Sequence, residues 1–332
     1  VAYCWGSNDR GQLGVPGAAT RPTPARLPGG LALASLTAGI AHSCALTRSG
    51  SALCWGSNDR GQLGDGTTTA RAAPVPVAGG RNFRLVRAGL SHTCALTSAG
   101  EAICWGANAN GQLGDGRQSG RSTPARVAGP ARFSALAAGW HHSCGITTEG
   151  TALCWGQNSS GQLGTGSTVD RAVPSAVDGG RRFRAITAGS AHSCALTQSG
   201  EVYCWGRNSS GQLGDGSGAD QARPVRVGGG LTFASVTAGS MHTCAVTRSG
   251  DAYCWGRNTY GQLGDGSTLD RPTPVKVRSD ASFRNVSASG AHTCGVASSG
   301  GAYCWGYNVD GQLGDGTRAH RARPVRVGDS RG

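Results

Sequence analysis

The chain has 332 residues, of which 31 are basic and 18 acidic, giving a formal net charge of +13. It contains 57 glycines and 13 cysteines, which indicates a turn-rich β protein, and no apolar run long enough to span a membrane. The chain opens at Val1 with no initiator methionine and no signal peptide, which we interpret as a processed product.

A repeat of fifty residues runs through the chain without insertion or deletion. Cys-Trp-Gly recurs at Cys4, Cys54, Cys104, Cys154, Cys204, Cys254 and Cys304. Gly-Gln-Leu-Gly begins at Gly11, Gly61, Gly111, Gly161, Gly211, Gly261 and Gly311, and a proline follows each copy. A period of fifty lies in the range of propeller blades. Because no linker interrupts the period, we expect one domain over residues 1–332.

Each unit carries four short segments with the composition of β-strands. In the unit from Phe183 to Gly229 these are, in chain order, FRAITAG, HSCALT (192–197), EVYCWG (201–206) and, after a long Gly/Ser/Asn loop, RPVRV (223–227). Alternating, β-branched and aromatic residues bounded by turn residues predict strands, and no useful helical period occurs. Four-stranded units repeated about an axis predict an all-β propeller.

The run A-G-x-x-H-(S/T)-x-A-L-T-x-x-G-x-x-x-x-W-G-x-N-x-x-G-Q-L-G-x-G resembles the repeat of the regulator of chromosome condensation (RCC1-type) family, here in a bacterial, secreted form. The resemblance implies a seven-bladed β-propeller of 50-residue RCC1-type repeats. Seven C-W-G segments are accompanied by only six A-G…H-x-C segments, so we expect the last blade to be incomplete in this chain. The absent parts are one F-x-x-V-x-A-G strand and one H-x-C strand.

The cysteines are expected to pair across hairpins. A three-residue turn at residues 48–50 places Cys44 directly opposite Cys54, at a separation that local twist can close. The six pairs are Cys44–Cys54, Cys94–Cys104, Cys144–Cys154, Cys194–Cys204, Cys244–Cys254 and Cys294–Cys304, with Cys4 left over. A rival scheme, Cys4–Cys44 and so on, leaves Cys304 instead, and buried reduced cysteines are the other alternative. Six disulfides indicate an oxidising compartment, hence a secreted or cell-envelope protein.

The basic residues are all arginine except Lys276, a composition typical of high-GC bacteria. Two periodic sets are expected to form rings on a propeller. The first is Arg21, Arg71, Arg121, Arg171, Arg271 and Arg321, and the second is Arg26, Arg126, Arg226, Lys276 and Arg326. These rings either bind a polyanion or pair with local acids such as Asp170 and Asp270. Without interleaved exposed aromatic residues they argue against nucleic acid as a partner.

No residue set in the sequence indicates catalysis, a metal or a cofactor. The repeated histidines (His42, His92, His142, His192, His242 and His292) lie on different units, so we expect each to bond backbone at a loop corner. The aspartates of the G-D-G segments, such as Asp65, are expected to form turns. No nucleophile–base–acid set departs from the repeat, so we expect a protein that is not an enzyme.

Residues that differ between units are the better candidates for a binding site. By strand parity, the A-G-x-x-H loop and the long G-x-N-x-x-G-Q-L-G loop emerge on one face. The residues of that face predicted to bind a ligand or partner are Trp140, His141, Arg207, Arg257, Tyr260 and Tyr307. Clustered aromatic residues and arginines are typical of interface hot spots.

These features predict a non-enzymatic extracellular scaffold that presents its loop face to a protein or a surface glycan. The resemblance implies two alternatives, an inhibitor of a secreted enzyme, like the family's β-lactamase inhibitor, and a guanine nucleotide exchange factor. Family exchange factors carry an inserted wedge, and a chain of uniform fifty-residue units has no such insertion.

Overall fold

The computed structural model describes residues 1–328, which form 26 β-strands and no helix. The first 14 strands are β1 (Tyr3–Ser7), β2 (Thr20–Arg26), β3 (Leu33–Ala38), β4 (His42–Thr47), β5 (Ala52–Gly56), β6 (Arg71–Pro76), β7 (Phe83–Ala88), β8 (His92–Thr97), β9 (Ala102–Gly106), β10 (Arg121–Arg126), β11 (Phe133–Ala138), β12 (His142–Thr147), β13 (Ala152–Gly156) and β14 (Arg171–Ala176). The others are β15 (Phe183–Ala188), β16 (His192–Thr197), β17 (Val202–Gly206), β18 (Gln221–Arg226), β19 (Ser235–Ala238), β20 (His242–Val246), β21 (Ala252–Gly256), β22 (Arg271–Lys276), β23 (Phe283–Ser289), β24 (His292–Ala297), β25 (Ala302–Gly306) and β26 (Arg321–Arg326).

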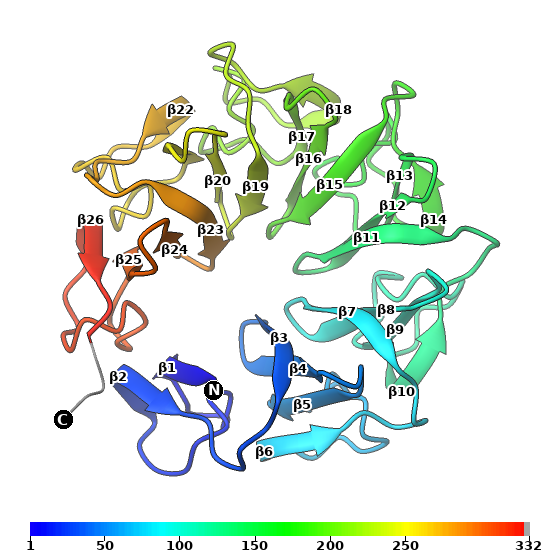
Figure 1. Cartoon of the computed structure of the whole chain (residues 1–332). Helices are drawn as coiled ribbons and strands as arrows, with labels where there is room; N and C mark the ends of the chain where they lie inside the picture. The colour runs from blue at the N-terminus through cyan, green and yellow to red at the C-terminus, as the bar shows by residue number, and fades with distance from the viewer. Residues whose placement is uncertain (329–332) are drawn as a thin grey trace.

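The strands form an all-β propeller, as the sequence predicts. Within residues 1–328, six antiparallel sheets of four consecutive strands are accompanied by one two-stranded sheet, β1–β2. Figure 1 shows the sheets as a ring, with β3, β7, β11, β15, β19 and β23 innermost. The expected seventh blade is not confirmed, because six sheets have the four strands of a blade and β1–β2 has only two.

The hydrophobic core lies between neighbouring blades. Between the β3–β6 and β7–β10 blades, Leu46 and Leu63 pack with Phe83, Val86 and Trp105, all of them buried. Phe83 and Trp105 sit with their ring centroids 6.1 Å apart, and the same pair recurs in the four following blades. Away from the two-stranded sheet, each blade therefore buries its apolar faces against the next one, as alternating strand patterns require.

Glycine is required where the long loop crosses the neighbouring blade. Gly114 has a φ of +69°, and a Cβ atom there would lie 2.7 Å from Nε1 of Trp155. A Cβ atom is not found that close to another heavy atom. The final position of the Gly-Gln-Leu-Gly segment therefore requires glycine both for its positive φ and for lack of space. The equivalent glycines meet Trp55, Trp105, Trp205, Trp255, Trp305 and Trp5 in the same way.

Six disulfides join the hairpins in the expected pairing. Cys44 lies opposite Cys54 in the β4–β5 register, with their Cα atoms 4.1 Å apart, and the other five bonds repeat this arrangement. Among the described residues Cys4 is the one free cysteine, and it is buried. The rival scheme starting at Cys4–Cys44 is therefore wrong.

A membrane-crossing helix is not found in residues 1–328.

Candidate functional site

One end of the propeller, the long-loop face, gathers the two loops of every blade. In the β4–β5 register His42 lies opposite Gly56, so the 39–41 loop and the 57–70 loop leave at the same end. The backbone N–H of Ser57 donates to the carbonyl of Ala41 at 2.8 Å. The equivalent bond joins Gln157 to His141, Arg257 to Met241, and Tyr307 to Ala291. The face assignment from strand parity is thus confirmed by the register.

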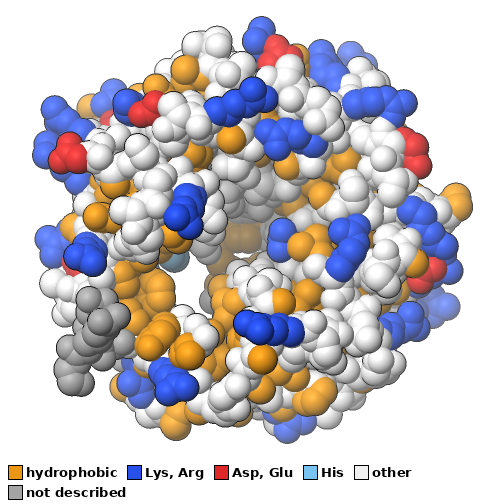
Figure 2. Space-filling model, viewed as in Figure 1, with side chains coloured by type: hydrophobic (Ala, Val, Ile, Leu, Met, Phe, Trp, Pro, Cys, Tyr) orange, Lys and Arg blue, Asp and Glu red, His pale blue; other side chains and the backbone are white. Residues whose placement is uncertain are grey.

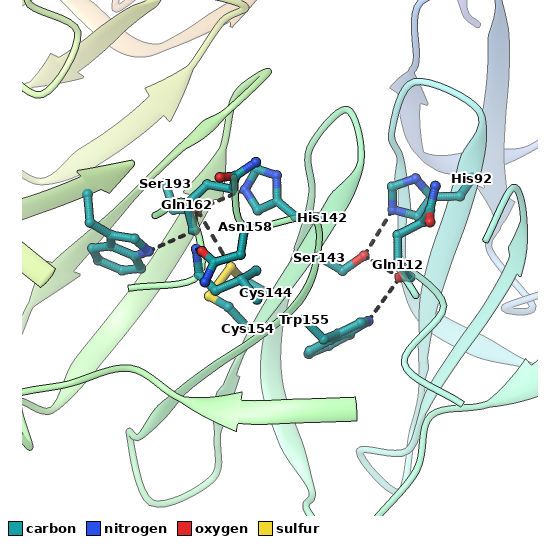
Figure 3. The surroundings of a disulfide bond; sticks show 12 residues. His92, Gln112, His142, Ser143, Cys144, Cys154, Trp155, Asn158, Gln162 and Ser193 are labelled. Carbon is teal, nitrogen blue, oxygen red and sulfur yellow. Dashed lines mark hydrogen bonds between the residues drawn. A yellow bond between two sulfur atoms is a disulfide. The ribbon is translucent and has the colours of Figure 1, made fainter. Parts of the chain in front are cut away.

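Five of the six repeated histidines, all except His292, are buried and connect neighbouring blades. Nε2 of His142 lies 2.9 Å from Oγ of Ser193, which donates to the carbonyl of Gln162 at 2.9 Å (Figure 3). Because the single hydroxyl hydrogen goes to Gln162, the serine oxygen accepts from the imidazole, which must carry its proton on Nε2. Trp205 donates to the same carbonyl at 3.0 Å. The expected backbone partner is wrong, because the ring points across the blade boundary to a hydroxyl.

Four further blade boundaries repeat this arrangement, with Ser or Thr as the hydroxyl residue. The histidines are His42, His92, His192 and His242. Burial lowers the pKa of all six repeat histidines to about 3 or 4, so they are neutral at pH 7. A neutral, fully packed imidazole with a fixed donor role is a structural element and is not placed to take part in acid–base chemistry.

The first arginine ring is largely neutralised by local acids. Nε of Arg71 lies 2.9 Å from Oδ2 of Asp65, and the same pair forms at three other blades. The expected partners Asp170 and Asp270 are wrong, because these carboxylates accept from the backbone N–H groups of Asn158 and Asn258. Burial and hydrogen bonds act in opposite directions on Asp65, and its pKa is lowered.

The second ring pairs in a similar way at the opposite end of the blades. Arg126 contacts Glu101, Arg226 contacts Glu201 at 2.7 Å, and Lys276 contacts Asp251 at 2.7 Å. These pairs are exposed, so each adds little to stability. Three of the five members of this ring, Arg126, Arg226 and Lys276, therefore have an acidic neighbour in their own blade.

Within residues 1–328, no group of three or more His, Cys, Asp or Glu side chains is arranged to hold a metal ion.

The structure brings Tyr260 and Tyr307 together. Tyr260 lies in the β21–β22 loop and Tyr307 at the start of the β25–β26 loop, and their ring centroids are 4.8 Å apart. His320 completes the group, with its ring 5.0 Å from Tyr260 and stacked 5.1 Å from Tyr307. We call these three residues the aromatic cluster. It joins two neighbouring blades, and Tyr260 and Tyr307 are half-buried while His320 is exposed.

His320 is the residue that the sequence argument missed. Its Nδ1 accepts from the backbone N–H of Asn308 at 3.0 Å, the role that Asp170 and Asp270 have in their own units. The exchange of an aspartate for a histidine at this repeat position is the signal that could have identified it.

The other predicted residues lie on the same face but not in the cluster. Nη1 of Arg257 lies 3.5 Å from the sulfur of Met241, and Nε of Arg207 donates to Ser209 at 3.1 Å. Trp140 is 36% exposed in the β11–β12 loop, two blades from the loop of Tyr260. Next to it, partial burial lowers the pKa of His141.

The family model described as "RCC1-like domain" matches residues 1–331 of the chain. Yeast RCC1 (Prp20), solved bound to Kap60, is 25% identical over 99% of this chain and 83% of its own, with a TM-score of 0.88. Prp20p from Saccharomyces cerevisiae, in a study that also covers its binding to Gsp1p and histones, is 26% identical over 99% of this chain and 86% of its own, with a TM-score of 0.87.

The entire ectodomain of the Physcomitrella patens receptor kinase CR4 is 26% identical over 91% of this chain and 65% of its own, with a TM-score of 0.61. A comparison with curated protein sequences finds no match.

Proposed function

Because the chain belongs to the RCC1-like domain family, we propose that it is a non-enzymatic, extracellular scaffold that binds a protein through its long-loop face. The observation that carries this proposal is the aromatic cluster, with three rings 4.8–5.1 Å apart across two blades. Tyrosines held by their neighbours offer a large contact area with little conformational entropy to lose on binding. Arg257, on the loop that carries Tyr260, adds a hydrogen-bond donor to the long-loop face.

The relatives and the charges support a protein as the partner. Yeast RCC1 is similar in fold over the whole chain and was solved with a protein, Kap60. The arginines of the two rings are mostly paired with acids within their own blades, which weakens the case for a polyanion. A surface glycan is the alternative ligand class.

The disulfides support an oxidising compartment. The likeness to a receptor-kinase ectodomain adds an extracellular relative of similar fold. Guanine nucleotide exchange and inhibition of a secreted enzyme remain the family's other functions. Nucleotide exchange on a small GTPase requires that the protein share a reducing compartment with the GTPase. Six structural disulfides argue against such a compartment.

The test compares three immobilised proteins: the wild type, Tyr307→Ala and Tyr303→Ala. Tyr303 lies on β25 of the same blade, at the end away from the long-loop face, and serves as the matched control. The probes are a fraction of secreted proteins, lipopolysaccharide and heparin, each at low and high salt. We expect a protein that the wild type and Tyr303→Ala retain and that Tyr307→Ala binds at least about tenfold more weakly.

Binding only to lipopolysaccharide or heparin would overturn the proposal, as would equal losses in the two variants of confirmed fold. A second variant, Tyr260→Ala, must also weaken binding to the same partner protein if the cluster acts as one surface.

We further propose that β1–β2 is the outer half of a seventh blade. Trp5 donates to the carbonyl of Gln312 at 2.9 Å, and Trp55 donates to that of Gln12 at 2.9 Å. The same bond joins three other blade boundaries, through Trp105, Trp155 and Trp205, and here it is made on both sides of the two-stranded sheet. This arrangement supports a ring of seven positions, one of which holds only its two outer strands.

A further inference from the structure

Inward of β1–β2, the surface exposes apolar side chains that the other blade boundaries bury or half-bury. Val296 on β24 is 40% exposed, whereas its equivalents Leu46, Leu96, Ile146, Leu196 and Val246 are at most 3% exposed. Leu36 on β3 is 42% exposed, whereas its equivalents Val86, Leu136, Ile186 and Val286 are at most 9% exposed and Val236 is half-buried. Figure 2 shows an opening bordered by hydrophobic atoms in this part of the molecule.

The other boundaries define what covers such positions. Leu46 packs against Phe83 and Val86 of the next blade's innermost strand, and Ile146 packs against Phe183 and Ile186 in the same way. By this pattern, the residues that would cover Val296 are an aromatic residue and a β-branched residue three positions apart on an innermost strand. The residue that would cover Leu36 is the apolar residue at the end of an H-(S/T)-C-A-L segment.

The polar groups and the free cysteine specify the same strand pair. In the other blades the Cys-Trp-Gly strand pairs with an H-x-C strand and forms a disulfide with it, but among residues 1–328 β1 pairs with β2 alone and Cys4 is free. The carbonyl of Gln112 accepts from both Ser143 and Trp155, whereas Gln312 accepts from Trp5 alone among the described residues. His292 likewise has no hydroxyl partner in residues 1–328, while the other repeat histidines each have one.

We propose that this surface, which we call the inner slot, binds a β-strand pair of the repeat's own inner pattern, F-x-x-(V/I)-x-A-G followed by H-(S/T)-C-A-L, and that its cysteine forms a disulfide with Cys4. The partner is thus a polypeptide segment of defined sequence pattern that adds two strands to the free edge of β1. In the bond-forming step the two thiols give up two protons and two electrons to a low-molecular-weight disulfide, which leaves as two thiols. The inference rests on the seventh-blade proposal and is independent of the aromatic cluster.

The burial of Cys4 agrees with a thiol that reacts with a docked strand in preference to small oxidants. Burial raises the pKa of the Cys4 thiol to about 11, so small oxidants find little thiolate to react with. A docked strand places its sulfur opposite Cys4 in the register that Cys194 and Cys204 adopt, and so favours this partner through proximity.

The chain supplies its own probe, a peptide of residues 183–200. Three blades share the tyrosine and tryptophan of Tyr3 and Trp5, and of these only the parent blade, with Tyr203 and Trp205, has an inner segment that ends in Cys-Ala-Leu. The 332-residue protein is mixed with this peptide and oxidised glutathione, and the disulfide-linked product is followed by intact mass. We expect a one-to-one adduct through Cys4, formed at least about tenfold faster than with a scrambled peptide of the same composition.

Three variants sharpen the result. Cys4→Ser must abolish the covalent adduct, and Val296→Asp must slow its formation about tenfold, since it places a charge in an apolar contact. Val173→Asp is the matched control, because Val173 is 43% exposed on β14, in a blade that does not border the slot, and its replacement must leave the rate unchanged.

Equal rates for the native and scrambled peptides would overturn the inference, as would equal rates for Val296→Asp and the wild type. A Cys4–Cys4 dimer that forms in preference to the peptide adduct would also overturn it, by assigning the slot to a second copy of the chain. If capture fails while Tyr307-dependent partner binding persists, only this inference is wrong and the proposed function stands.

Discussion

At the scale of single residues, the buried hydroxyl between neighbouring blades stabilises the fold through two hydrogen bonds. Ser193 accepts from His142 and donates to Gln162, and all of these groups are buried. A buried donor that loses its partner costs the full desolvation of that group. The chain itself shows which substitution the site tolerates, since Thr replaces Ser at Thr93, Thr243 and Thr293.

We therefore predict that Ser193→Ala lowers the free energy of unfolding by about 1–3 kcal/mol, because it orphans the His142 N–H. Ser193→Thr, the matched control, should change it by less than about 1 kcal/mol. Urea unfolding monitored by tryptophan fluorescence gives both values. Equal effects of the two substitutions would show that the hydroxyl bond is unimportant.

The same histidines make stability depend on pH. Their pKa lies at about 3 or 4 in the folded protein, below the ordinary value of 6.5, because burial disfavours the charged ring. Below pH 6.5 the unfolded chain therefore binds protons that the folded chain does not, and stability must fall as pH falls from 6.5 towards 4.

We predict a loss of about 1.4 kcal/mol per pH unit for each buried histidine in the steep part of this window. Unfolding free energies measured between pH 7.5 and 4.5 should decline with a slope approaching one proton per buried histidine, and His142→Asn should reduce that slope. A flat profile between pH 6.5 and 5 would contradict the assignment of neutral, buried rings.

At the scale of the element, the hairpin could be predicted from residues close in sequence, whereas the long loop depends on contacts between units. The hairpin register was predictable, because a three-residue turn and facing cysteines ten positions apart allow one alignment, and the disulfides have that pairing. The loop's partners were not predictable from one unit. His142 and Ser193 are 51 residues apart, and Tyr260 and His320 belong to successive units, so these contacts appear only once the blades are packed.

The charges illustrate the same limit. Asp170 is next to Arg171 in sequence, yet the loop turns its carboxylate to the N–H of Asn158. The acid that neutralises the ring sits six positions earlier, as in Asp65 and Arg71, because the G-D-G turn folds back on the strand. Sequence proximity therefore gave the wrong partner while the general expectation of local pairing was right.

We predict that Gly114→Ala destabilises the protein more than Gly230→Ala. Both glycines have nearly the same φ, +69° and +66°, so both substitutions carry the same backbone cost of about 1–2 kcal/mol. Only Gly114 would bring a Cβ against Trp155, 2.7 Å from its Nε1, which adds about 1–3 kcal/mol of overpacking. Equal midpoints of thermal unfolding in the two variants would show that the long loop is not held against the next blade.

At the scale of the whole molecule, an undisturbed fifty-residue period was enough to predict an all-β propeller with one group of strands per unit. It predicted the loop face as well, because strand parity fixes which loops share an end. The count of four-stranded blades needed the coordinates, since β1–β2 bonds to both neighbours like a blade yet has two strands.

The central claim is a disulfide-stapled binding propeller of an oxidising compartment. Intact mass after denaturation and alkylation without reduction tests it most directly. The account predicts one alkylated thiol, Cys4, before reduction and 13 alkylated cysteines after it. Alkylation of all 13 cysteines without reduction in freshly isolated protein would contradict the disulfides and, with them, the extracellular role.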